Sequence, residues 1–336
     1  MTDDGLLFIS YKDTLELFGA EDALDVVENV YGMHARGTVQ WSDPKDFRMD
    51  VEEFSNHWHV KGCTLKEIPV AGVRMYGYFE DSERSTVGTL DSTRYIVISD
   101  PVTSVPLAIV DEHWSFSLRS TAATVVACRW MGPLDRETPL VLGLVGVGSM
   151  GRTALMCLST MYQFSEIRCT SRRPETREAF AAEWSETLAT SVVPVASVEE
   201  CALGADIIVG GTTSTDVVCR ADWLKPGATF ISLARHELDP QGWAEMDKIV
   251  IDDWGFNMLS PYFRQTVEAG HLSRETLHAE IWELVAGTKG GRERADERIL
   301  IHTTGLVSQD VAIAHWIYER ARERGLGTRL PLAHLS

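Results

Sequence analysis

A glycine-rich turn follows a short apolar run near the middle of the chain. Leu140 to Val145 has the length and branching of a buried strand, and it leads into GVGSMG, a G-x-G-x-x-G pattern. The first glycine permits a tight turn, the second lets the backbone approach a pyrophosphate, and the third lets strand and helix pack closely. The helix that follows offers its N-terminal N–H groups to phosphates. The spacing therefore predicts a dinucleotide site formed by Gly146, Gly148, Ser149, Met150 and Gly151.

The end of the next predicted strand indicates which dinucleotide is bound. Ser171-Arg172-Arg173 stands where an NAD enzyme usually places a carboxylate for the ribose hydroxyls. Two guanidinium groups and a hydroxyl suit a 2′-phosphate, because arginine binds phosphate in a bidentate manner. Solvated arginines at a helix start are the alternative interpretation. We expect NADP(H) to be preferred, with NAD(H) possible.

Composition restricts the class of protein. The 336 residues are enough for two domains with separate cores. The 31 Lys and Arg against 49 Asp and Glu give a formal net charge of −18, which argues against a nucleic-acid or anionic-membrane surface. A small anionic ligand would then need a local cluster of arginines.

The compartment is predicted from what the sequence lacks. No stretch approaches the roughly 20 apolar residues of a membrane span, and the start MTDDGLLFIS does not resemble a secretory signal. The six cysteines show no spacing suited to zinc, so we expect reduced, mostly buried thiols and no metal site. These features predict a cytoplasmic protein.

The residues before the glycine motif predict an α+β domain. Residues 6–11 can form a strand, and residues 20–36 carry apolar side chains at helical spacing with Gly37 as a stop. Residues 39–110 contain short strand-like runs and predict a mostly antiparallel sheet. A small-residue helix at 115–130 and a linker at 131–139 should follow.

The residues after the motif predict a doubly wound parallel sheet, because strands alternate with helices. A final strand at 299–302 and a helix at 309–325 follow a charged, glycine-rich stretch at 287–297, which we expect to be a surface loop. The fold class is α/β, with a Rossmann sheet and a separate α+β domain. We expect domains over 1–125 and 126–310, and a C-terminal helical segment over 311–336.

Four motifs resemble the ornithine cyclodeaminase and mu-crystallin family. They are LRSTAA (118–123), GLVGVGSMG (143–151), ADWLKPGATFIS (221–232) and TTGLVSQD (303–310). The resemblance covers nearly the whole chain. It implies a substrate-binding and dimerisation domain, an NAD(P)-binding Rossmann domain, a last helix that returns to the first domain, and a homodimer.

Within that family, the C-terminal third is most similar to 2,3-diaminopropionate-forming dehydrogenases of siderophore biosynthesis. The similar stretches are DKIVIDDW (247–254), SRETLHAEIWELVAGTKGGRE (273–293) and IYERARERGLGT (317–328). Those enzymes oxidatively split N-(2-amino-2-carboxyethyl)-L-glutamate into 2,3-diaminopropionate and 2-oxoglutarate. The resemblance therefore implies hydride transfer at the α-carbon of an acidic N-substituted amino acid.

The resemblance also implies three substrate arginines. Arg119 lies in the LRSTAA motif and is expected to bind the substrate carboxylate, since the guanidinium fork pairs with a carboxylate in a bidentate manner. Arg48 is a looser match, and a solvated loop arginine is the alternative. Arg74 stands where the family usually has lysine. Because arginine does not deprotonate in proteins, Arg74 is expected to bind or polarise the substrate.

Two residues are candidates for proton transfer. His113 precedes the LRSTAA motif, and imidazole titrates near neutral pH, although a histidine that caps a turn is the alternative. Asp310 matches a family aspartate near the nicotinamide, and its alternative role is the N-cap of the last helix. Thr212 and Thr213 are expected cofactor contacts at the carboxyl end of a strand.

The loop after the strand at 229–233 departs from the pattern of the ornithine-cyclising members. They carry an aspartate in a glycine-rich loop there, whereas this chain has ARHELDP (234–240), with His236 and Glu237 as the nearby titratable groups. The departure argues against ornithine cyclisation.

Taken together, these features predict an NAD(P)-dependent oxidoreductase that acts on the C–N bond of a small anionic amino acid or imine. Within the family, the resemblance implies an N-(2-amino-2-carboxyethyl)-L-glutamate dehydrogenase-like enzyme. One alternative is a cyclic ketimine reductase for pyrroline or piperideine carboxylate, or an ornithine cyclodeaminase. Another is an NADPH-dependent binding protein without catalysis.

Overall fold

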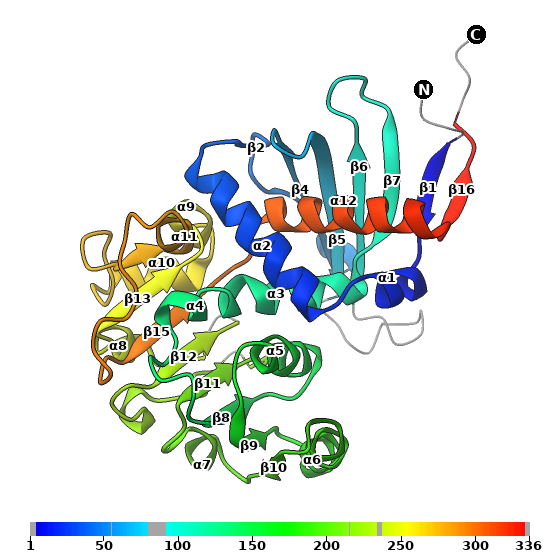
Figure 1. Ribbon diagram of the computed structural model, residues 1–336. Coiled ribbons are helices and arrows are strands. Elements are labelled where there is room, and N and C mark those ends of the chain that lie inside the picture. The colour runs from blue at the N-terminus through cyan, green and yellow to red at the C-terminus, as the bar shows by residue number, and fades with distance from the viewer. Residues whose placement is uncertain (1–4, 55, 80–91, 215, 234–236, 333–336) are drawn as a thin grey trace. The chain divides into compact units, whose positions relative to one another are not determined.

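The computed structural model describes residues 5–54, 56–79, 92–214, 216–233 and 237–332. The chain forms two compact units (Figure 1): unit 1 comprises Met1–Arg119 and Leu306–Ser336, and unit 2 comprises Ser120–Gly305. Both boundaries between the units fall a few residues before the boundaries expected from the sequence, 125/126 and 310/311. The chain enters unit 2 within one helix and leaves it just before another. The last helix belongs to unit 1.

Unit 1 contains an eight-stranded sheet with the order β16-β1-β7-β6-β5-β4-β2, in which β3 also pairs with β4. Its strands are β1 (Leu6–Ile9), β2 (Val39–Trp41), β3 (Phe47–Val51), β4 (Asn56–Leu65), β5 (Val70–Phe79), β6 (Ser92–Ser99), β7 (Pro106–Asp111) and β16 (Thr328–Leu330). All neighbouring strands are antiparallel except β1 and β7. The expected antiparallel sheet over 39–110 is thus present, and two terminal strands extend it.

The helices of unit 1 are α1 (Tyr11–Leu17), α2 (Ala20–Ala35), the 3-10 turn η1 (Glu52–Phe54), the first part of α3 (His113–Val125) and α12 (Val307–Arg324). The strand predicted at 6–11 ends at Ile9, because Ser10 caps α1 and the Asp13 carboxylate accepts the Ser10 N–H at 2.9 Å. Helix α12 packs on β4, β5 and β6, and on α2. A Cβ at Gly72 would lie 2.7 Å from the Val311 side chain, so this glycine permits the close approach of β5 and α12.

Unit 2 contains an eight-stranded, wholly parallel sheet with the order β10-β9-β8-β11-β12-β15-β13-β14. Its strands are β8 (Leu140–Val145), β9 (Phe164–Thr170), β10 (Ser191–Pro194), β11 (Ile207–Gly210), β12 (Thr229–Ser232), β13 (Lys248–Ile251), β14 (Ala279–Glu280) and β15 (Ile299–His302). Every residue of β11, β12, β13 and β15 is buried, which requires cover on both faces of the sheet. The predicted doubly wound fold is confirmed.

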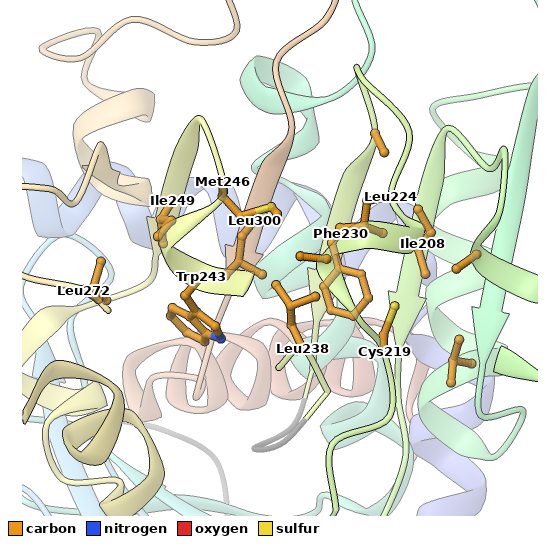
Figure 2. Close-up of a cluster of buried hydrophobic side chains, with 14 of the residues drawn as sticks. Ile208, Cys219, Leu224, Phe230, Leu238, Trp243, Met246, Ile249, Leu272 and Leu300 are labelled. Carbon is orange, nitrogen blue, oxygen red and sulfur yellow. The ribbon is translucent and has the colours of Figure 1, made fainter. Parts of the chain in front are cut away.

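The helices of unit 2 are the remainder of α3, α4 (Cys128–Met131), α5 (Ser149–Ser159), α6 (Pro174–Leu188), α7 (Val198–Ala202), η3 (Ala221–Trp223), α8 (Pro240–Ala244), α9 (Trp254–Asn257), α10 (Pro261–Glu268) and α11 (Ile281–Val285). One apolar cluster packs Phe230 and Leu300 of the sheet against Leu238 and Trp243 (Figure 2). Trp243 is 1% exposed and is the largest fully buried side chain among the described residues. This core fixes the carboxyl ends of β11, β12 and β15, where a doubly wound fold binds its ligand.

The stretch at 287–297 is a mostly exposed loop, as predicted, but Arg292 and Glu297 within it are buried. The Arg292 guanidinium, 7% exposed, donates to the carbonyl oxygens of Met131, Gly227 and Glu297 and to the Thr229 hydroxyl. Because these partners lie at strand starts and at the end of α4, Arg292 joins segments far apart in the sequence. The predicted linker at 131–139 likewise lies inside unit 2, since Met131 takes part in this network.

All six cysteines are buried and free, as predicted. Burial raises the thiol pKa of Cys157 to about 12 and that of Cys169 to about 11, so these thiols stay protonated at neutral pH. In the described part of the chain, no helix is long and apolar enough to span a membrane.

Candidate active site

The turn between β8 and α5 has the geometry that the glycine motif predicts. Gly146 adopts φ +93°, and a Cβ there would lie 2.5 Å from the Gly211 carbonyl oxygen. A Cβ at Gly151 would collide with the Gly146 carbonyl. Beside Gly148, by contrast, a Cβ would meet nothing within 4 Å, and this residue is the N-cap of α5. The first and third glycines are therefore required for packing, and the second leaves space for a ligand at the helix N-terminus.

Helix α5 begins at Ser149, inside the glycine motif, because Gly148 acts as its N-cap. Ser149 and Met150 therefore occupy its first turn, where N–H groups have no partner within the helix. A helix N-terminus of this kind can bind a phosphate, and the role of both residues in a dinucleotide site stays a prediction.

The segment after β9 carries two exposed arginines. Arg172 and Arg173 are both exposed, and Arg173 is the N-cap residue of α6. The Ser171 hydroxyl donates to the Arg173 carbonyl at 2.9 Å, and Arg177 donates to the Ser171 carbonyl at 3.1 Å. These backbone contacts hold the segment without engaging the guanidinium groups of Arg172 and Arg173. Both groups are thus available to an anionic ligand.

A buried glutamate that the motifs did not predict joins the ends of two central strands. Glu237 is 1% exposed and accepts the Thr212 N–H at 3.0 Å and the Leu233 N–H at 2.7 Å. These residues follow β11 and β12, so the carboxylate fixes both strand-end loops. The sequence placed Glu237 only near the site, and His236 lies outside the described residues. The role of Glu237 follows from tertiary contacts and has no local sequence signature.

The two predicted threonines lie on the loop that Glu237 holds. The Thr212 methyl is 3.2 Å from the position that a Cβ on Gly146 would occupy, so Thr212 lies beside the glycine turn. Thr213 is exposed. Both are placed at the carboxyl end of β11, where cofactor contacts were predicted.

Unit 1 contains a buried cluster of arginines and carboxylates. The Arg74 Nε on β5 lies 2.7 Å from both Glu112 carboxylate oxygens and 3.7 Å from Asp310 Oδ2. On α3, the Arg119 Nε lies 2.5 Å from Asp310 Oδ1. None of these four side chains is more than 5% exposed. Two predicted arginines and the predicted aspartate are therefore brought together, along with Glu112, which the motif analysis missed.

Asp310 is not the N-cap of α12, which was its alternative role. The N-cap is Leu306, and Asp310 is buried in the first turn, with its carboxylate directed at Arg74 and Arg119. An acidic group near a helix N-terminus is also favoured by the helix dipole.

A third guanidinium group, from Arg94 on β6, joins the cluster. The guanidinium carbons of Arg94, Arg119 and Arg74 lie 3.8, 5.1 and 5.2 Å from the centre of the Phe116 ring. Arg74 and Arg94 also lie 4.1 and 5.8 Å from the centre of the Tyr76 ring. On β6, Arg94 stands two and four residues before the buried Ile96 and Ile98. Because side chains alternate between the faces of a strand, this pattern could have predicted that Arg94 lies on the buried face.

Several buried polar atoms of this cluster lack a hydrogen-bond partner among the described residues. They are Arg74 Nη2, Arg119 Nε, Gln309 Nε2 and Asp310 Oδ1. The ion pair of Arg119 with Asp310 is close but not aligned for a hydrogen bond. Arg119 Nε and Asp310 Oδ1 face each other in their ion pair. Arg74 Nη2 remains as a buried donor without a partner among the described residues, and because buried donors are normally satisfied, it indicates a ligand site.

Two predicted residues make contacts outside this group of ion pairs. Arg48, on β3, has a half-exposed side chain that pairs with Asp50 at 2.6 Å. His113 is the first residue of α3, with its Nδ1 2.9 Å from Asp111 and its ring edge-on to Tyr95. The contact of Arg48 is that of a solvated arginine, and the contact of His113 is that of a histidine that caps a turn, which were the alternative interpretations of these two residues.

Comparison with known proteins places the whole chain in one family. The model of the Ornithine cyclodeaminase/mu-crystallin family matches residues 7–325. An N-((2S)-2-amino-2-carboxyethyl)-L-glutamate dehydrogenase of Staphylococcus aureus is 27% identical over 279 residues, which are 82% of this chain and 80% of that protein.

Two solved structures have the same fold. The Thermococcus litoralis Delta(1)-pyrroline-2-carboxylate reductase, in complex with NADH and L-proline, matches with a TM-score of 0.88 and 24% identity, over 97% of this chain and all of that one. An archaeal alanine dehydrogenase dimer with bound NAD matches with a TM-score of 0.87 and 25% identity, over 98% and 99% of the two chains. The chain belongs to the Ornithine cyclodeaminase/mu-crystallin family.

Proposed function

We propose that the protein is a pyridine-nucleotide-dependent oxidoreductase that acts on the C–N bond of an anionic amino acid or imine. The observation that carries the proposal is the buried cluster of Arg74, Arg119 and Asp310, in which Arg74 Nη2 has no partner among the described residues. The relatives described above are named for reactions on amino acids or imines, and two of the solved structures hold NADH or NAD.

The residues of unit 2 fit a dinucleotide. The open space beside Gly148 and the first turn of α5 suit the pyrophosphate, while Thr212 stands beside the glycine turn. When bound, the nicotinamide would supply the donor or acceptor of a hydride. The exposed Arg172 and Arg173 and the absence of a carboxylate directly after β9 support a preference for NADP(H) over NAD(H).

In unit 1, Arg119 and Arg74 would hold the α-carboxylate of the substrate. Both guanidinium groups are paired with internal carboxylates, Arg74 with Glu112 and Asp310 and Arg119 with Asp310, and Arg74 retains an N–H group on Nη2 without a partner among the described residues. The internal carboxylates fix the planes of both guanidinium groups, so the remaining donors are oriented before the substrate arrives. Such preorganisation lowers the entropy cost of binding.

One proton must also be transferred, because oxidation of an amine to an imine releases a proton from the nitrogen. Arg74 cannot accept it, since arginine remains charged in proteins. Asp310 Oδ1 lies 2.5 Å from Arg119 Nε and Asp310 Oδ2 lies 3.7 Å from Arg74 Nε, so this carboxylate stands between the two arginines proposed to hold the substrate. We assign the proton to Asp310 because of this position. Hydrogen-bond reach to the substrate nitrogen is the geometric requirement for this role.

The reaction is tested by following nicotinamide absorbance with purified protein, NADP+ or NAD+, and a panel of candidate substrates. The panel contains N-(2-amino-2-carboxyethyl)-L-glutamate, alanine, ornithine and reduced or oxidised cyclic imino acids. Arg119→Met should lower kcat/KM by about 100-fold or more, because a charged bidentate contact is lost. Arg36→Met, an exposed arginine of unit 1 paired with Glu67, is the matched control.

Two alternatives have distinct outcomes in the same assay. A cyclic ketimine reductase, which the resemblance to the pyrroline-2-carboxylate reductase favours, would turn over a cyclic imine faster than any open-chain substrate. A binding protein would hold NADPH tightly with no absorbance change for any substrate. Absence of turnover across the panel would contradict the proposed function.

We further propose that the protein forms a homodimer through the sheet of unit 1. On the face opposite Arg74, exposed apolar side chains gather on adjacent strands: Phe47, Met49, Val73, Met75 and Val97. A cavity of about 330 Å³ lies on this face, lined in part by Val73 and Val97. An exposed apolar surface of this kind is typical of an interface.

The dimer is tested by sedimentation velocity. Met75→Glu should yield a monomer, because the substitution would bury an unpaired charge in the interface. Leu203→Glu, at an exposed apolar residue of unit 2, should leave the sedimentation coefficient unchanged. A wild-type protein that sediments as a monomer would contradict this proposal.

A further inference from the structure

A histidine and an aspartate form a hydrogen-bonded dyad on the face of the unit 1 sheet that carries Arg74. The His59 Nδ1 on β4 lies 2.8 and 3.0 Å from the two Asp46 carboxylate oxygens. Because an ionised carboxylate only accepts hydrogen bonds, Nδ1 carries the ring proton, and Nε2 has a lone pair when the ring is neutral. The dyad is therefore a base whose tautomer is fixed by its partner.

The imidazole ring of His59 lies beside the buried cluster of the proposed site. His59 pairs in register with Tyr76 on β5, and the two rings stack with their centres 4.9 Å apart and their planes 10° apart. The Arg74 guanidinium carbon lies 4.1 Å from the centre of the same Tyr76 ring. Tyr76 thus packs against both the dyad and a guanidinium group proposed to hold the substrate carboxylate.

The groups around His59 favour a neutral ring at neutral pH. Burial lowers the pKa of His59 from 6.5, and the Asp46 carboxylate opposes this change. The positive charges of Lys61 and His57, on either side along β4, also lower the pKa. Arg48, in register with His59 on β3, adds a further positive charge on this face. The His59 side chain remains 17% exposed, so the ring can exchange a proton with water.

Oxidation of the substrate needs a second proton acceptor besides Asp310. The nitrogen of an amino acid is protonated at neutral pH, so its conversion to a neutral imine removes one hydride and two protons. A carboxylate such as Asp310 takes up one proton. Another base must therefore lie within reach of the substrate nitrogen. The neutral ring of His59 has an acceptor nitrogen and lies beside Arg74, as this role requires.

We propose that His59 exchanges the second proton with the substrate nitrogen, and that Asp46 holds the ring in the required tautomer. This inference rests on the proposed function and adds a catalytic residue to the same site. An N–H bond of the substrate ammonium breaks, its proton goes to His59 Nε2, and its electron pair stays on the nitrogen. The Cα–H bond then gives a hydride to the oxidised nicotinamide, the lone pair forms the C=N bond, and a second N–H proton goes to Asp310. Reduction of an imine follows these steps in reverse.

The pH dependence of oxidation tests the role of His59. For the best substrate of the panel, kcat of the wild type should fall as the pH drops through the pKa of His59, because an imidazolium accepts no proton. His59→Gln should lower kcat by about 100-fold or more, change KM by less than about 3-fold, and remove this fall. His271→Gln, at a partly buried histidine of unit 2, is the matched control and should match the wild type.

The variant of Asp46 gives a distinct result, because Asp46 is a positioning residue. Asp46→Asn removes the charge that stabilises the imidazolium, so the fall in kcat should move to lower pH. In His59→Ala, added imidazole should raise kcat by at least about 10-fold, because a free base can take the place of the missing ring. A purely structural role of the dyad would produce neither the shift nor the rescue.

The outcomes separate this inference from the proposed function. A kcat of His59→Gln within about 3-fold of the wild type would overturn the inference and leave the proposed function intact. The same conclusion follows if kcat is lowered but keeps the wild-type pH profile and imidazole gives no rescue. A wild-type protein without turnover of any substrate would contradict the proposed function, and the inference with it.

Discussion

Arg74 and Glu112 form a buried ion pair in which the arginine Nε lies 2.7 Å from both carboxylate oxygens. Both side chains are at most 5% exposed. Because arginine does not deprotonate in proteins, the pair combines a permanent cation with its own counter-ion. Burial raises the pKa of Glu112, and the charge of Arg74 opposes that change. The pair holds the Arg74 guanidinium in place within the cluster.

Removing one partner of this ion pair should lower the free energy of unfolding more than removing both partners. Glu112→Gln leaves the Arg74 charge buried without its main counter-ion and should lower the free energy of unfolding by about 3 kcal/mol. The double variant Arg74→Met with Glu112→Gln should recover most of that loss, because no buried charge at these two positions remains uncompensated. Urea denaturation of the single and double variants measures the coupling. Additive losses in the double variant would show that the pair contributes no coupling.

The two arginines after β9 should decide between the two nucleotides. Arg172→Ala with Arg173→Ala should weaken NADPH binding by about 10- to 100-fold and change NADH binding by less than about 3-fold, because only NADPH carries a 2′-phosphate. Fluorescence titration with each nucleotide measures both dissociation constants. Arg220→Ala, another exposed arginine of unit 2, is the control. Equal losses for NADPH and NADH would disprove the assignment of NADP(H).

Glu237 should couple nucleotide affinity to the geometry of two loops. Glu237→Ala leaves the N–H groups of Thr212 and Leu233 without their acceptor and should weaken NADPH and NADH equally, by about 10-fold. Glu237→Gln, which keeps one acceptor oxygen, should show a smaller loss. A cofactor titration alongside a thermal melt separates loop positioning from general instability. Unchanged affinity with lowered stability would restrict Glu237 to a structural role.

The buried His302 should make stability depend on pH. It packs against Trp243 and Phe263, and burial lowers its pKa from 6.5 to about 4. The fold therefore favours the neutral ring. The contribution of His302 is present above about pH 6.5 and is lost as the pH falls toward 4, by roughly 3 kcal/mol. As the pH falls over this range, the unfolding free energy of the wild type should therefore decrease by that amount relative to that of His302→Phe.

Asp252 provides the opposite control for the same measurement. Burial raises its pKa from 3.8 to about 6, although its carboxylate accepts N–H bonds from Thr304 and Gly305. Its contribution is present below about pH 4 and is lost as the pH rises through 6. The difference between wild type and Asp252→Asn should therefore change with pH in the opposite direction. A pH-independent difference for both variants would contradict the two pKa shifts.

The parts of the fold that depend on local pattern could be predicted from the sequence. The glycine turn at 146–151, the strand at 140–145 and the long helix from Ala20 follow from residues close together in the chain. So does the doubly wound sheet of unit 2, because alternating strands and helices leave few topologies. The family followed from motifs such as LRSTAA, and the family comparison confirmed it.

The tertiary structure decided which charged residues meet. Arg119 and Asp310 are nearly two hundred positions apart, and their contact depends on how α3 and α12 pack on the sheet of unit 1. Arg94 joined the cluster through strand register, which sets side-chain neighbours across strands. Glu112 follows the end of β7, and Glu237 bridges two loops, so both were placed by tertiary contacts. The sequence alone determined the local units and their chemistry, whereas long-range pairing selected the residues that form the site.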